Sequence, residues 1–227
     1  MEIYYMNILE FKEKLKDFAA FNLNDIRKID AGFDLRRLNE WQEKGYIKMI
    51  RRGHYAFSGL EINESVLSLL ANKIYTPSYV SLEMALSYYN LIPEAVYGIT
   101  SVTSRKTNRF TTDFGEFIYR HIKPQLMFGY RLIGYSGQNF KIAEPEKTIL
   151  DYFYLNTDLN AAEDFAGLRF NSEEFKEQTD KNKLRRYLIA FGNKSLEKRF
   201  NKFLKYINHG SSLFQVGSLN SSLPPMR

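Results

Sequence analysis

Hydrophobic residues recur with the period of a helix through the first 45 positions of the chain. Spacings of three and four separate Phe11, Leu15 and Phe18, as expected for a helix that buries one face. Asn22 precedes Asp25 by three residues, a spacing typical of a helix N-cap with an acidic first turn. The pattern predicts three short helices: one over residues 8–18, one over 22–29, and one that Asp34 caps and Gly45 ends.

The third of these helices has a hydrophobic side and a charged side. Leu35, Leu38 and Trp41 share one side at about 100° per residue, and Arg36 and Glu40 lie opposite. Long polar side chains of this kind can reach base edges in DNA, arginine to guanine above all. A surface helix with solvated charges has the same pattern. The candidate DNA contacts on this helix are Phe33, Arg36, Arg37 and Glu40.

A basic hairpin is expected directly after the third helix. Two β-prone runs, residues 47–51 and 54–57, meet at Arg52-Gly53. Arginine at such a tip contacts phosphates or the minor groove, and glycine lets the backbone approach closely. A charged turn that serves solubility is the alternative. Three helices followed by this hairpin predict a winged helix-turn-helix over residues 1–58, with further contacts from Arg51, Arg52 and His54.

The pattern changes after Ser58. Helical spacing predicts helices over residues 66–74 and 81–89, and Pro145 suits the first position of another. Two more helical stretches, near 184–191 and 196–207, follow. The strands expected between these helices cover residues 98–103, 117–121, 129–135 and 140–143. We therefore expect an α+β fold: a mixed α+β domain over 59–209 follows the winged helix-turn-helix, and 210–227 form a flexible or extended tail.

Composition narrows the class of protein. The chain has 227 residues, a formal net charge of +6 and no cysteine, which excludes disulfides, cysteine-based zinc sites and thiol nucleophiles. No run of 18 apolar residues predicts a membrane span, and the first residues lack the layout of a signal peptide. A cytoplasmic protein without a membrane partner is expected.

Positive charge is gathered in three stretches, residues 47–57, 102–131 and 181–206. The middle stretch interleaves cations with aromatic residues on predicted strands, which suits a second contact surface for nucleic acid. A sheet with a buried aromatic face and a solvated cationic face is the alternative. The candidates for the second DNA surface are Arg105, Lys106 and Arg109.

Signatures of catalysis are scarce. The chain has no Walker loop, no GxSxG and no GxGxxG after a strand. The run 144–147 (EPEK) has the acid-x-Lys pattern of some nucleases, but its proline is expected to start a helix, where acids suit the dipole. The histidines at 54, 121 and 209 lack metal-site spacing. We expect no catalytic activity, metal or cofactor. The alternatives are a nuclease that docks through the winged helix, and a protein-interaction module.

Three blocks of the sequence, in this order, resemble the AbiEi family of antitoxins from type IV (abortive-infection) toxin–antitoxin systems. They are residues 41–55 (WQEKGYIKMIRRGHY), 79–93 (YVSLEMALSYYNLIP) and 142–151 (IAEPEKTILD). The resemblance covers about residues 10–155.

The resemblance implies an antitoxin that represses its own operon. In that family the winged helix binds inverted repeats in double-stranded operator DNA, and the C-terminal domain is needed to neutralise the toxin. The toxin is nucleotidyltransferase-like, and no direct complex between toxin and antitoxin is implied.

Overall fold

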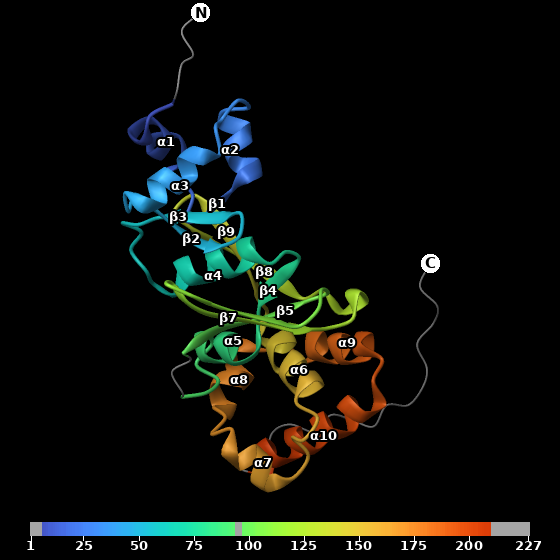
Figure 1. Ribbon diagram of the computed structural model, residues 1–227. Coiled ribbons are helices and arrows are strands. Elements are labelled where there is room, and N and C mark those ends of the chain that lie inside the picture. The colour runs from blue at the N-terminus through green and yellow to red at the C-terminus, as the bar shows by residue number, and fades with distance from the viewer. Residues whose placement is uncertain (1–5, 94–96, 210–227) are drawn as a thin grey trace, which may run out of the picture.

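A computed structural model of the chain describes residues 6–93 and 97–209. Helices and strands follow one another in a mixed α+β arrangement (Figure 1), as the sequence predicts. The expected tail, residues 210–227, lies outside the described residues.

The first unit of the fold, residues 6–57, holds three helices and a small antiparallel sheet with strand order β1-β3-β2. Its elements are α1 (Ile8–Leu15), β1 (Phe21–Asn22), α2 (Leu23–Ile29), α3 (Arg36–Glu43), β2 (Ile47–Arg51) and β3 (His54–Phe57). The helix start expected at Asn22 is confirmed. Asn22 and Asp25 each accept a hydrogen bond from the backbone of the other, forming a capping box.

Aromatic rings hold the first unit together. Phe11 and Phe21 are fully buried, and the centre of the Phe11 ring lies 5.3 Å from that of Phe21 and 4.7 Å from that of Trp41. Such pairs contribute about 0.5–1.5 kcal/mol each beyond the area they bury. This seam packs one side of α3 against α1 and leaves the opposite side in solvent.

The second unit is built on a six-stranded mixed sheet. The strand order is β6-β7-β5-β4-β9-β8; β4 is parallel to β9 and β5 to β7. The strands are β4 (Ser78–Val80), β5 (Gly98–Thr103), β6 (Asn108–Thr112), β7 (Gly115–His121), β8 (Tyr130–Tyr135) and β9 (Gln138–Ala143). The pattern misses β4, which has only three residues, and β6, an edge strand that is too polar to alternate.

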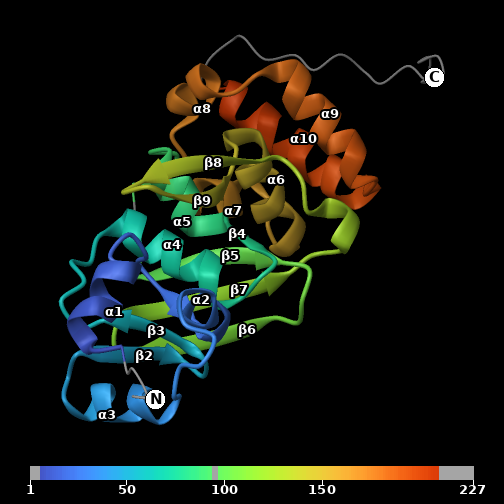
Figure 2. The ribbon, with the colours of Figure 1, turned by 90° about the horizontal axis from the view of Figure 1, so that it is seen from above.

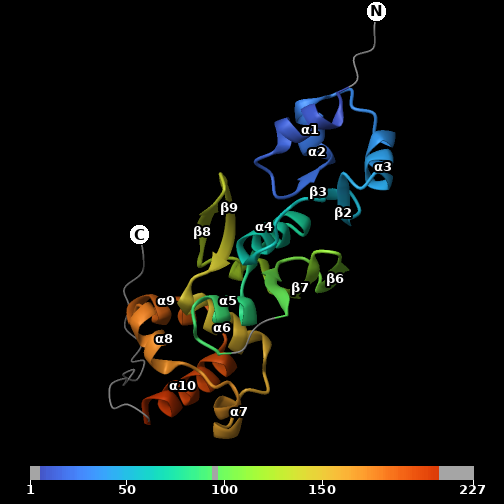
Figure 3. The ribbon, with the colours of Figure 1, turned by 90° about the vertical axis from the view of Figure 1, so that its left-hand side faces the viewer.

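Helices cover both faces of this sheet. Helix α4 (Glu64–Ile74) lies on the face nearer the first unit, whereas α5 (Leu82–Tyr88) and α6 (Pro145–Leu155) lie on the other (Figure 3). The remaining helices are η1 (Pro124–Leu126), α7 (Ala162–Gly167), α8 (Ser172–Gln178), α9 (Lys181–Phe191) and α10 (Lys194–His209). Helices α7 and α8 are absent from the sequence prediction because six or seven residues give too short a periodic pattern.

The two units are joined by residues 58–63 and also pack against each other. Lys73 at the end of α4 pairs with Asp25 of α2 at 2.7 Å and lies over the Phe18 ring. Ile50 and Ala56 of the small sheet belong to the hydrophobic core of the second unit. Side chains on the two sides of the boundary expected near residue 58 therefore pack against each other.

Candidate nucleic-acid interface

Helix α3 has a buried side and a solvent side, and it lies at the outer edge of the molecule (Figure 2). Leu38 and Trp41 are buried, as their spacing predicts. Leu35 was expected on the same side, but its side chain is 41% exposed. The physical reason is that Leu35 is the N-cap residue, so it precedes the turns that pack on the core.

Arg36 and Glu40 are the candidates on the solvent side of α3. The Arg36 side chain is 91% exposed, and its guanidinium pairs with Asp34 at 2.9 Å. That pairing, with a hydrogen bond from the Arg36 backbone, holds the pKa of Asp34 below its usual range. Glu40 is exposed and pairs with Lys44 at 2.6 Å. Both candidates are thus accessible, and Asp34 orients the guanidinium.

The other two candidates from this region turn into the protein. Arg37 donates a hydrogen bond to the Met6 carbonyl, and its guanidinium lies 5.0 Å from the centre of the Trp41 ring. Phe33 packs against Phe11 and Trp41, with each pair of ring centres 5.5 Å apart. These contacts stabilise the first unit and hold α3 in place.

The β2–β3 turn presents one arginine to solvent. Arg52 is exposed and has no acidic partner within the described ranges. Gly53 has a φ of +79°, a conformation that favours glycine. Burial lowers the pKa of the neighbouring His54, and the charge of Arg51 acts in the same direction. Both effects favour the neutral form of the imidazole.

Arg51 turns from the hairpin toward the second unit. Its Nη1 donates to the Ile74 carbonyl at 2.6 Å, and its guanidinium lies 5.7 Å from the Tyr75 ring centre and 4.8 Å from that of Phe110. Ile74 ends α4 and Phe110 lies on β6. Arg51 therefore ties the hairpin to the second unit, although the sequence groups it with Arg52.

The candidates of the second basic stretch lie at one corner of the six-stranded sheet. Arg105 and Lys106 belong to the β5–β6 connection, and Arg109 lies on β6. All three are exposed. Arg109 forms two contacts with Glu116, one of them Nη2 to Oε2 at 2.6 Å, which offsets its charge. Lys106 has no acidic partner among the residues that the structure describes.

Two residues of this region were missed by the sequence analysis. Lys48 is exposed on β2, and its Nζ lies 4.0 Å from the Asp113 carboxylate. Its position between the hydrophobic residues Ile47 and Ile50, which are buried, could have predicted a cation that faces solvent. Tyr75 follows α4 and is buried, and a tyrosine at a helix end does not reveal from sequence which cations will surround it.

The acidic run at the start of α6 has partners inside the protein. Glu144 and Glu146 pair with Lys183 of α9 at 3.1 and 3.3 Å. Lys147 and Asp151 pair where neither side chain has exposed surface. Burial lowers the pKa of Lys147 and raises that of Asp151, while their mutual attraction opposes both shifts. Across the described residues, no group of three histidine or acidic side chains could hold a metal ion.

The second and third blocks of the family resemblance meet at this buried pair. Tyr79 and Ser81 donate hydrogen bonds to Oδ2 of Asp151 at 2.9 and 3.0 Å. The Lys147 ammonium lies 5.5 Å from the centre of the Tyr79 ring. Residues 79–93 and 142–151 therefore pack together in the middle of the second unit, where β4 and β9 are neighbouring strands and α5 and α6 lie on one face of the sheet (Figure 3).

Comparison with known proteins does not assign the chain to a family. No family model matches the sequence, and no curated protein matches it. None of the described helices is both long and apolar enough to cross a membrane.

Proposed function

We propose that residues 6–57 form a winged helix-turn-helix that binds double-stranded DNA, and that the protein is a transcriptional repressor. The observation that carries the proposal is the position of α3 at the outer edge of the molecule (Figure 3). One side of the helix is packed on an aromatic seam, and Arg36 extends from the other. Reading a major groove requires this combination of a fixed helix and a long polar side chain.

The hairpin supports the same proposal. Strands β2 and β3 follow α3 directly, and Arg52 at their turn is exposed without an acidic partner in the described part of the chain. A wing beside a reading helix contacts the phosphate backbone or the minor groove. We assign base reading to Arg36 and backbone contact to Arg52.

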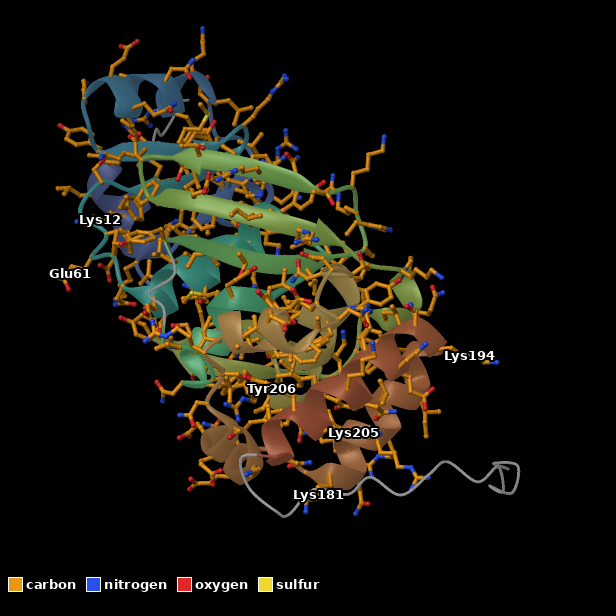
Figure 4. The ribbon with its side chains drawn as sticks, turned by 90° about the horizontal axis from the view of Figure 1, so that it is seen from below. Lys12, Glu61, Lys181, Lys194, Lys205 and Tyr206 are labelled. Carbon is orange, nitrogen blue, oxygen red and sulfur yellow. The ribbon has the colours of Figure 1, made fainter. Side chains whose placement is uncertain are left out.

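Selection from a random-sequence pool of duplexes by the full-length chain tests this function. The wild-type chain should enrich a shared motif. Arg36→Ala should weaken binding to the selected duplex by about 1–3 kcal/mol, with little change on a scrambled duplex. Lys205→Ala, an exposed lysine on α10 (Figure 4), is the matched control and should change neither. Failure of the wild-type chain to enrich any motif would overturn the proposal.

The resemblance to AbiEi antitoxins extends the proposal to a toxin–antitoxin operon. We propose that the second unit neutralises a nucleotidyltransferase-like toxin, while the first represses the operon. Support comes from the packing of the two C-terminal blocks into the core of the second unit, whereas α3 packs on the core of the first. Two units with separate cores suit two separate tasks.

A co-expression assay separates these tasks in the full chain. Arg36→Ala should lose repression of a reporter that carries the operon's own promoter. The same variant should still rescue cells from the toxin encoded beside it, because α3 lies apart from the second unit's blocks. Loss of rescue along with repression, at equal protein levels, would contradict the assignment of antitoxicity to the second unit.

A further inference from the structure

One aromatic ring joins the hairpin of the first unit to the sheet of the second. The centre of the Tyr75 ring lies 5.7 Å from the Arg51 guanidinium and 4.4 Å from that of Arg105. Two cations that contact one ring bring the β2–β3 hairpin next to residues 104–107, the connection between β5 and β6. Figure 2 shows β2 and β6 side by side, in agreement with the contact between Arg51 and Phe110.

Hydrogen bonds to backbone carbonyls fix this junction. Arg51 donates to Ile74 at 2.6 Å, and Arg105 donates to Thr76 at 3.2 Å. The Tyr75 hydroxyl donates to the carbonyl of Lys106 at 2.9 Å. These bonds tie the hairpin and the connection to the same end of α4, so the two segments are held as one body.

The cations around the junction differ in their availability to a ligand. Lys106 and Arg52 are exposed, with no acidic partner in the described ranges. Arg105 is also exposed, and a guanidinium that stacks on a ring keeps N–H donors at its edge. Arg109 differs because Glu116 already binds its guanidinium through two contacts.

We infer that the DNA-binding surface continues from the β2–β3 turn onto residues 104–107, where Arg105 and Lys106 contact phosphates beyond those reached by Arg52. This inference rests on the proposed function, since it presumes that α3 occupies the neighbouring major groove. Contacts of lysine and arginine with phosphates add affinity without reading sequence. A junction that is already rigid loses little conformational entropy when DNA binds.

Two double variants, each on two lengths of duplex, test the inference. Arg105→Ala/Lys106→Ala removes the proposed contacts. Lys194→Ala/Lys205→Ala removes the same number of charges from α10, a helix that lies apart from the first unit (Figure 4). Binding of each protein is measured on two duplexes. One contains the selected motif alone, and the other contains the motif with about 10 base pairs, one helical turn, added on each side.

On the longer duplex, Arg105→Ala/Lys106→Ala should reduce the magnitude of the log–log salt slope by about 1.8, or about 0.9 per phosphate contact. The α10 variant should keep the wild-type slope on both duplexes. On the short motif all three proteins should have the same slope. Arg105→Lys/Lys106→Arg, which keeps both charges, should restore the slope and shows that any loss is not a folding defect.

The outcomes distinguish a failure of the extended surface from a failure of the proposed function. A wild-type slope for Arg105→Ala/Lys106→Ala on the longer duplex overturns the extended surface and leaves DNA binding by α3 intact. An equal loss in the α10 variant overturns it as well, because the effect would then follow from net charge. If the wild-type chain enriches no motif, it is the proposed function that fails.

Discussion

The first and second units place their charges differently. Every buried residue that the structure describes in residues 6–57 is hydrophobic or aromatic, whereas the second unit buries Glu146, Lys147, Asp151 and Arg199. A charge at the surface remains available to a ligand, but a charge taken out of water needs a partner within the protein. The depth of a charged residue therefore separates binding roles from structural ones, which sequence spacing alone does not.

The largest expected effect is in the second unit. Lys147→Met should lower the free energy of unfolding by about 3–5 kcal/mol, because it leaves Asp151 buried without its cation. Urea denaturation followed by circular dichroism measures this.

A matched control in the first unit sharpens the comparison. Lys44→Met breaks the exposed pair with Glu40 and should leave the denaturation midpoint unchanged. The double variant Lys147→Met/Asp151→Leu should recover part of the lost stability, because no unpaired charge then remains. If Lys147→Met were as stable as Lys44→Met, the buried ion pair of the second unit would contribute no more to stability than the exposed pair of the first.

Much of the first unit could be predicted because its local signals agree with its packing. The capping box at Asn22 and the boundaries of β2 and β3 follow from spacing and turn residues. Strand β6 could not be predicted, because an edge strand paired only with β7 needs no hydrophobic alternation.

The candidate site was harder to predict for a different reason. Arg36 and Arg37 are adjacent on a helix, yet one faces solvent while the other contacts Met6 and Trp41. Arg51 similarly reaches Ile74, 23 positions further along the chain. Sequence spacing assigns a residue to a side of its own element. It does not show which distant carbonyl or ring a long side chain will meet.

The next largest effect on stability is expected when one of the two neighbouring arginines of α3 is replaced. Arg37→Ala should lower the free energy of unfolding by about 1–3 kcal/mol, since it removes a charge-assisted hydrogen bond and a contact with the Trp41 ring. Arg36→Ala should leave the stability unchanged and weaken only DNA binding. Thermal unfolding and binding isotherms, measured on both variants, check this division. Equal stability losses would contradict it.

A smaller effect is expected at the hairpin. Arg51→Lys keeps the charge but loses the planar group that spans the Tyr75 ring and the Ile74 carbonyl. We expect a loss of about 1–2 kcal/mol in the free energy of unfolding, with the salt slope of DNA binding unchanged. Arg52→Lys is the control, and it should leave both quantities as in the wild type. If the salt slope were reduced in Arg51→Lys but not in Arg52→Lys, Arg51 would have to be counted among the DNA contacts.

The smallest effect separates two exposed arginines that differ in their partners. Arg52 has no acidic partner in the described residues, so Arg52→Ala should weaken binding to selected and scrambled duplexes alike and reduce the magnitude of the salt slope by about 0.9. Arg109→Ala removes a guanidinium that Glu116 already binds, so the slope should stay at the wild-type value. Glu116→Gln frees that guanidinium, and a slope steeper than wild type in this variant would show that ion pairing had kept Arg109 from the phosphates. If Arg109→Ala lowered the slope as much as Arg52→Ala, the pair with Glu116 would not keep Arg109 from the phosphates.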